Sequence, residues 1–120
     1  MTRQTLRLAT LLISIIIAPA ALSCDYPARV ELPNGMTAEK EDMLSAQRLV
    51  KQYVADMEAY LDCIVAEEKA ARQDMVDLAP EDEEQREEML NKKYNAAVEE
   101  MERVAAAFNA EVQAYRGKNE

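Results

Sequence analysis

Two cysteines, Cys24 and Cys63, are the residues of this 120-residue sequence best suited to covalent chemistry. A cysteine becomes a nucleophile when a neighbouring base takes its proton, and His is the side chain that most often does so. The sequence contains no His, which also removes the commonest zinc ligand. We therefore expect a structural disulfide between Cys24 and Cys63 rather than a reactive thiol, in a protein that reaches an oxidising compartment.

Acidic side chains are the second group that could do chemistry, because 23 Asp and Glu against 14 Lys and Arg give a net charge of −9. They are densest between residues 74 and 88. The Asp-x-Asp-x-Asp-Gly spacing of a calcium loop is missing, and no predicted cleft would raise the pKa of one carboxyl group. We predict a solvated helix end with no metal, cofactor or catalytic residue, and therefore no enzyme. Nucleic acid is excluded as a partner, because it needs clustered Lys and Arg.

Two long helices must carry these side chains, since two Gly and four Pro leave little material for the turns of a β fold. Thr37 has the character of a helix N-cap, and no Gly or Pro follows it before Ala79-Pro80. We expect one helix over residues 37–78. A second helix is expected over residues 81–116, ended by Gly117 and followed by a short tail over 117–120.

A seven-residue apolar repeat gives each predicted helix one continuous packing face. The repeat positions are Met43, Val50, Met57, Ile64, Ala71 and Leu78 in the first helix and Tyr94, Met101, Phe108 and Tyr115 in the second. An antiparallel hairpin folded at Ala79-Pro80 sets Met57 opposite Met101, and the seam methionines are expected to fill the core. The apolar face is wider than a two-stranded seam needs. Either two hairpins dimerise into a four-helix bundle, or the N-terminal segment covers the excess.

An extended segment is expected over residues 24–36, where Pro33-Asn34-Gly35 forms a turn. If a helix starts at Thr37, Cys63 lies roughly 39 Å along it at ~1.5 Å per residue. The chain from Cys24 to Thr37 spans at most about 43 Å when fully extended. The disulfide is therefore within reach if the segment runs back along the helix almost fully stretched. One edge of the hairpin would then be covered by Tyr26, Val30 and Leu32.

The first residues, 1–23, have the composition of an export signal, with two Arg ahead of an apolar run over residues 8–18 and small residues after it. Two kinds of processing remain open. Cleavage by an ordinary signal peptidase predicts a periplasmic or secreted protein. A lipoprotein-like box at Ala21-Leu22-Ser23-Cys24 would instead place an acyl chain on Cys24, leave Cys63 as a free thiol and tether the protein to a membrane.

Three short motifs stand out between residues 24 and 63, namely Cys24-Asp25-Tyr26-Pro27, Leu32-Pro33-Asn34-Gly35 and Tyr60-Leu61-Asp62-Cys63, together with Tyr53. They resemble those of a group of small secreted proteins of proteobacteria. The resemblance covers about residues 24–65 and implies a Gram-negative envelope location without catalytic activity.

The sequence predicts a non-enzymatic exported helical protein that associates with a protein partner or with itself through its helix faces. One alternative is a lipoprotein acylated on Cys24, for which alone a membrane is a partner. Another is a chaperone-like binder of unfolded periplasmic proteins, which would need an accessible apolar groove.

Overall fold

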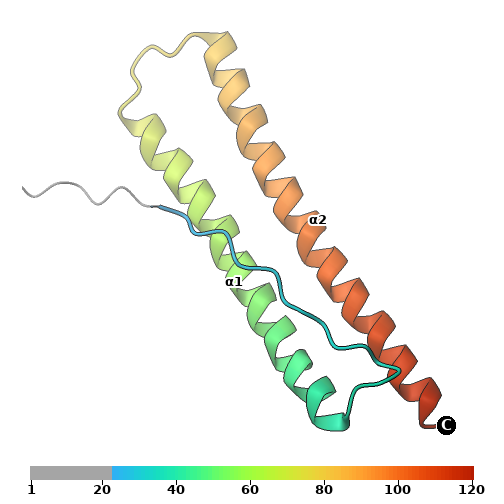
Figure 1. Ribbon diagram of the computed structural model, residues 1–120. Helices are drawn as coiled ribbons and strands as arrows, with labels where there is room; N and C mark the ends of the chain where they lie inside the picture. The colour runs from blue at the N-terminus through green and yellow to red at the C-terminus, as the bar shows by residue number, and fades with distance from the viewer. Residues whose placement is uncertain (1–22) are drawn as a thin grey trace, which may run out of the picture.

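The computed structural model describes residues 23–120 and shows an all-α hairpin with an extended N-terminal segment (Figure 1). Helix α1 runs Lys40–Gln73 and helix α2 runs Pro80–Lys118, and the two pack against each other. The described residues contain no strand. The predicted fold class is confirmed, whereas the predicted export signal over residues 1–23 lies outside the described part except for its last residue.

Helix α1 begins at Lys40, so the predicted start at Thr37 is wrong. The backbone N–H groups of Thr37 and Ala38 both donate to the carbonyl of Asn34, at 3.1 and 2.8 Å. Thr37 therefore belongs to a turn that precedes the helix and does not cap it. The cap is Glu39 instead, whose N–H donates to Oδ2 of Asp42 at 3.0 Å. This is the backward half of a capping box, which satisfies a donor that the first helical turn leaves free.

The two helices are joined by residues 74–79, so the predicted continuation of the first helix to Leu78 is wrong. Asp77 in this connection has a φ of 62°. That left-handed conformation is incompatible with a helix, and Asp tolerates it better than most residues. Pro80 occupies the first turn of α2, as expected from its fixed φ and missing N–H.

The C-terminal end of α2 lies beyond the predicted boundary at residue 116, because Gly117 continues the helix. The cap is Asn119, whose backbone N–H donates to the carbonyl of Arg116 at 3.1 Å. The side-chain amide of Asn119 donates to the carbonyl of Tyr115 at 2.7 Å. These two bonds satisfy carbonyl groups at the helix end, so a left-handed Gly is not needed there.

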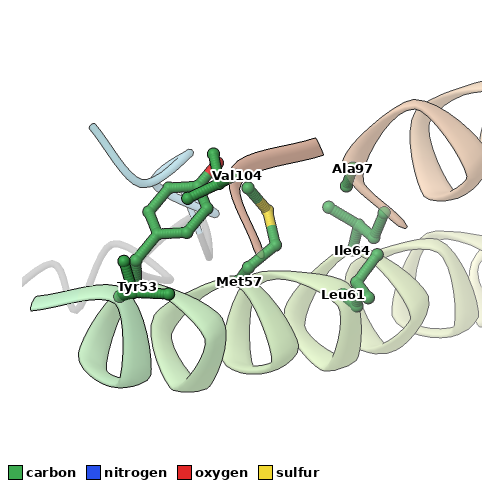
Figure 2. Packing of buried hydrophobic residues seen from close by; sticks show 7 residues of the cluster. Tyr53, Met57, Leu61, Ile64, Ala97 and Val104 are labelled. Carbon is green, nitrogen blue, oxygen red and sulfur yellow. The ribbon is translucent and has the colours of Figure 1, made fainter. Parts of the chain in front are cut away.

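The core lies between the two helices and follows the predicted repeat. Met57 and Ala97 are fully buried, and Met57 lies between Val104 and Ala97 in Figure 2. This placement agrees with the predicted register of Met57 opposite Met101, since Met101 is midway between the two α2 residues. The buried cluster consists of Val50, Tyr53, Met57, Leu61, Ile64, Ala97 and Val104. Met57 fills the centre of the seam, as predicted.

Residues 23–34, which we call the strap, run along the hairpin from the middle of α1 to the C-terminal part of α2 (Figure 1). The half-buried residues of the strap are Cys24, Pro27, Val30, Leu32 and Pro33. The two prolines favour an extended backbone here, because each fixes its own φ and restricts the residue before it. Val30 and Leu32 pack against the core as predicted.

Candidate functional site

A disulfide fixes the start of the strap to the middle of α1. It joins Cys24 to Cys63 with their Cα atoms 5.7 Å apart, as the sequence predicted, and neither thiol is free in the described residues. The two residues are 39 positions apart in the chain. A cross-link over a loop of this length stabilises a fold mainly by restricting the unfolded chain.

An ion pair fixes the middle of the strap to α2. Nε of Arg29 donates to Oε1 of Glu100 at 2.8 Å, and Nη2 of Arg29 lies 2.6 Å from the same oxygen. Glu100 is the only buried charged residue in the described part of the chain, at 9 % exposure. Arg103 provides a second cation for the Glu100 carboxylate. A buried carboxylate needs such partners, because burying an unpaired charge is costly.

The turn after the strap rests on the last part of α2. The N–H of Gly35 donates to Oε2 of Glu111 at 2.6 Å. A Cβ added to Gly35 would overlap the backbone carbonyl of Glu111 and lie 2.9 Å from the backbone nitrogen of Tyr115. Nζ of Lys118 donates to the carbonyl of Ala38 and lies 4.8 Å from the centre of the Tyr115 ring. The strap is thus held at both ends and at its middle.

A groove of about 550 Å³ lies between the strap and α1, and we call it the strap groove. Its apolar walls are formed by Tyr26, Pro27, Val30, Leu49, Tyr53 and Tyr60, and the Cys24–Cys63 disulfide lies at one end. The rings of Tyr26 and Tyr60 meet edge to face, with centroids 5.0 Å apart and planes at 74°. This is a favourable geometry for an aromatic pair, and it holds the wall of the groove in place.

Tyr53 contributes the most deeply buried wall of the strap groove, at 3 % exposure. Its hydroxyl group has no hydrogen-bond partner among the described residues. Burial raises the pKa of Tyr53, and the neighbouring Tyr26 and Glu100 raise it further. Burial likewise raises the pKa of Tyr26, with the Glu100 carboxylate acting in the same direction. Both phenol groups are therefore neutral at physiological pH.

The opposite side of the hairpin has no covering segment among the described residues, and we call it the open flank. The strap contacts the side of α1 that carries Leu49, Tyr53 and Tyr60. Helical periodicity places a different set of apolar residues on the other side. The open flank comprises Val54 and Val65 of α1 and Tyr94, Val98, Ala105 and Val112 of α2. Val65 and Tyr94 are 44 % and 39 % exposed, which leaves apolar surface in contact with water.

An ion-pair network ties the helices together near their connection. Nε and Nη2 of Arg86 donate to the two carboxylate oxygens of Glu68 at 3.0 and 2.9 Å. Arg72 bridges Glu68 and Glu83, at 3.1 and 3.0 Å. Partial burial alone would raise the pKa of Glu68, but the hydrogen bonds and the positive charges of Arg86 and Arg72 together outweigh it and lower the pKa. The network holds α2 against α1 near the connection, beyond the buried apolar residues of the core.

The acidic residues of the connection and of the first turn of α2 are exposed, as expected for a solvated helix end. Among residues 23–120, no three His, Cys, Asp or Glu side chains gather as metal ligands would. None of the described helices is long and apolar enough to cross a membrane.

Sequence reasoning missed two of the three anchors of the strap. Glu100 falls within the apolar repeat between Ala97 and Val104, and an acid at such a position was a signal for a buried ion pair. The sequence indicates only a turn at Gly35, whereas in the structure the absence of a side chain there lets the backbone approach α2 closely.

A search with this chain against protein-family models, curated proteins and solved structures finds no match.

Proposed function

We propose that this chain is a non-enzymatic exported protein of the cell envelope that acts by packing its open flank against a second copy of itself. The observation that carries the proposal is the apolar open flank, whose Val65 and Tyr94 side chains are more than one-third exposed. Apolar residues that continue across two adjacent helices are typical of an interaction surface.

A second copy suits the open flank because the flank is made of two antiparallel helices. Two such flanks facing each other across a two-fold axis would form a four-helix bundle and cover the exposed Val65 and Tyr94 side chains. The strap lies on the other side of each hairpin and remains outside that interface. A homodimer therefore needs no rearrangement of the strap or of its anchors.

The mass of the exported protein in solution tests the proposal. We expect light scattering to give a dimer for the unaltered protein and a monomer for Val65→Glu, which places a charge on the open flank. Ala55→Glu is the matched control, because Ala55 is exposed on the face of α1 turned away from α2 and its variant should stay dimeric. A monomer at concentrations of about 100 μM, where weak dimers form, would refute self-association.

Export is supported by the disulfide, because such bonds persist in oxidising compartments. Intact-mass measurement of the natively exported protein, before and after reduction and alkylation, tests this part. We expect a chain that has lost its first 20 to 23 residues and gains two alkyl groups only after reduction. A mass increased by acyl chains, with Cys63 alkylated without reduction, would identify the lipoprotein instead.

A further inference from the structure

The strap groove leaves apolar groups uncovered on the side of the hairpin that the open flank does not use. Tyr26 and Leu49 on its walls are each 52 % exposed. Its volume of about 550 Å³ falls in the range of sites that hold a small ligand or a few side chains. The disulfide and the Tyr26–Tyr60 ring contact fix the two sides of the groove relative to each other, so an occupant meets a preformed surface.

The charged residues that line the strap groove are both acidic. Asp25 and Asp56 lie in its lining, whereas no Lys or Arg of the described residues does. The side-chain amide of Gln52 donates to Oδ1 of Asp56 at 2.7 Å and orients that carboxylate. Oε2 of Glu67 lies 3.2 Å from Sγ of Cys24, which adds a third carboxylate at the disulfide end. Arg29, the nearest cation of the strap, is engaged by Glu100 on α2.

We propose that the strap groove binds a short peptide segment of another protein in which bulky apolar side chains are flanked by Lys or Arg. The apolar side chains fill the space between Tyr26, Leu49 and Tyr60, and the flanking cations face Asp25 and Asp56. The exposed ring of Tyr26 can also stack against a cation. This site lies opposite the open flank, so the inference stands whether or not the protein dimerises.

Titration of synthetic fluorescent peptides by anisotropy tests the inference with the intact, oxidised protein. The probe is Gly-Arg-Leu-Phe-Arg-Gly, and its two comparison peptides carry Glu in place of both Arg or Gly in place of Leu and Phe. We expect the probe to bind about tenfold more tightly than either comparison peptide, and more weakly as salt is raised. Equal binding of the acidic peptide, or no binding of the probe at millimolar concentration, would overturn the proposal.

Variants locate the binding site. Leu49→Ser should weaken the probe about fivefold, because half of this side chain is exposed for contact. The double variant Asp25→Asn with Asp56→Asn should remove most of the salt dependence. Glu58→Gln with Asp62→Asn is the matched control, since both residues are exposed on the other side of α1 and the change in net charge is the same. If the control weakens the probe as much, the attraction is non-specific and the assignment of the groove is wrong.

Discussion

The backbone of Gly35 lies directly against that of Glu111, with the N–H of the first donating to the carboxylate of the second at 2.6 Å. The contact brings together residues separated by 76 positions in the chain. It places the turn between the strap and α1 on the last part of α2. The turn that precedes α1 is therefore joined to the last part of α2 through one residue that has no side chain.

Replacing Gly35 by Ala should destabilise the protein, because the added methyl group overlaps the Glu111 carbonyl and backbone cannot yield as a flexible side chain would. We expect the free energy of unfolding to fall by about 2 to 3 kcal/mol, measured by urea denaturation. Gly117→Ala is the control: nothing lies within 4 Å of its new methyl group, and the helix should gain up to about 1 kcal/mol. Equal effects at the two positions would contradict the close approach.

Removing the disulfide with Cys24→Ser and Cys63→Ser should lower the free energy of unfolding by up to about 4 kcal/mol, the value for a loop of roughly 40 residues. The physical reason is that the unfolded chain regains freedom that the cross-link denied it. Urea denaturation with and without a reductant measures the effect. The reductant should shift the midpoint of the unaltered protein and leave that of the double variant in place. An unshifted midpoint for both proteins would show that the strap is held by its other contacts alone.

Arg29 and Glu100 should be energetically coupled, because the carboxylate is nearly buried and both Nε and Nη2 of the guanidinium group face it. A double-mutant cycle with Arg29→Ala and Glu100→Gln should give a coupling of about 1 kcal/mol. The exposed pair of Glu88 and Lys92 on α2 provides the comparison, and its coupling should be weaker. Additive effects of the Arg29 and Glu100 substitutions would mean that Arg103 alone satisfies the carboxylate.

Glu68 should make stability depend on acid pH. Burial opposes ionisation of Glu68, but the hydrogen bonds and positive charges of Arg86 and Arg72 together outweigh it and lower the pKa in the folded protein from the ordinary value of 4.5. The contribution of Glu68 to the free energy of unfolding is thus complete above pH 4.5 and is lost as pH falls through the lowered pKa. We expect thermal unfolding of Glu68→Gln to vary less with pH across this interval. Glu88→Gln, at an exposed helix position, is the control and should retain the pH dependence that Glu68 causes.

Tyr53→Phe should stabilise the protein by about 1 kcal/mol, because the tyrosine hydroxyl is buried without a hydrogen-bond partner in the described residues. The raised pKa of Tyr53 has a related consequence in alkali. Because folding opposes ionisation of this phenol, the free energy of unfolding does not depend on Tyr53 ionisation below the ordinary pKa of 10.0 and falls as pH rises from there through the raised pKa. Urea denaturation at neutral pH and near pH 11 compares the two proteins. A less stable Phe variant would show that the hydroxyl group has a partner after all.

Helix packing and the disulfide could be predicted because they follow from regular spacing and from chain length. A repeat of seven that includes Met57 and Ile64 identifies a buried face wherever the helix persists. The distance from Cys24 to Cys63 along a stretched strap against a helix is fixed by backbone dimensions. Neither argument requires knowledge of which side chains meet.

The end of α1 and the anchors of the strap could not be predicted in the same way. Leu78 continues the apolar repeat, yet the helix ends before Asp74 and the backbone is left-handed at Asp77. The spacing of apolar residues carries no information about such a change of backbone conformation. The pairing of Arg29 with Glu100 depends on where the strap crosses α2. That crossing is set by three-dimensional contacts across 71 positions of the chain, not by local sequence.

The anchors of the strap also order the events by which a newly made chain matures, because synthesis runs from the N-terminus to the C-terminus. Cys24 and Cys63 both emerge before any residue of α2, so the covalent tether can close on α1 alone. Glu100, Glu111 and Lys118 emerge last, and until then the strap is held at one end. A chain that stops before residue 100 can form its disulfide and still lack Glu100, Glu111 and Lys118, the residues of α2 that hold the strap and the turn after it. Oxidation of the thiols is therefore no proof of a completed fold in this protein.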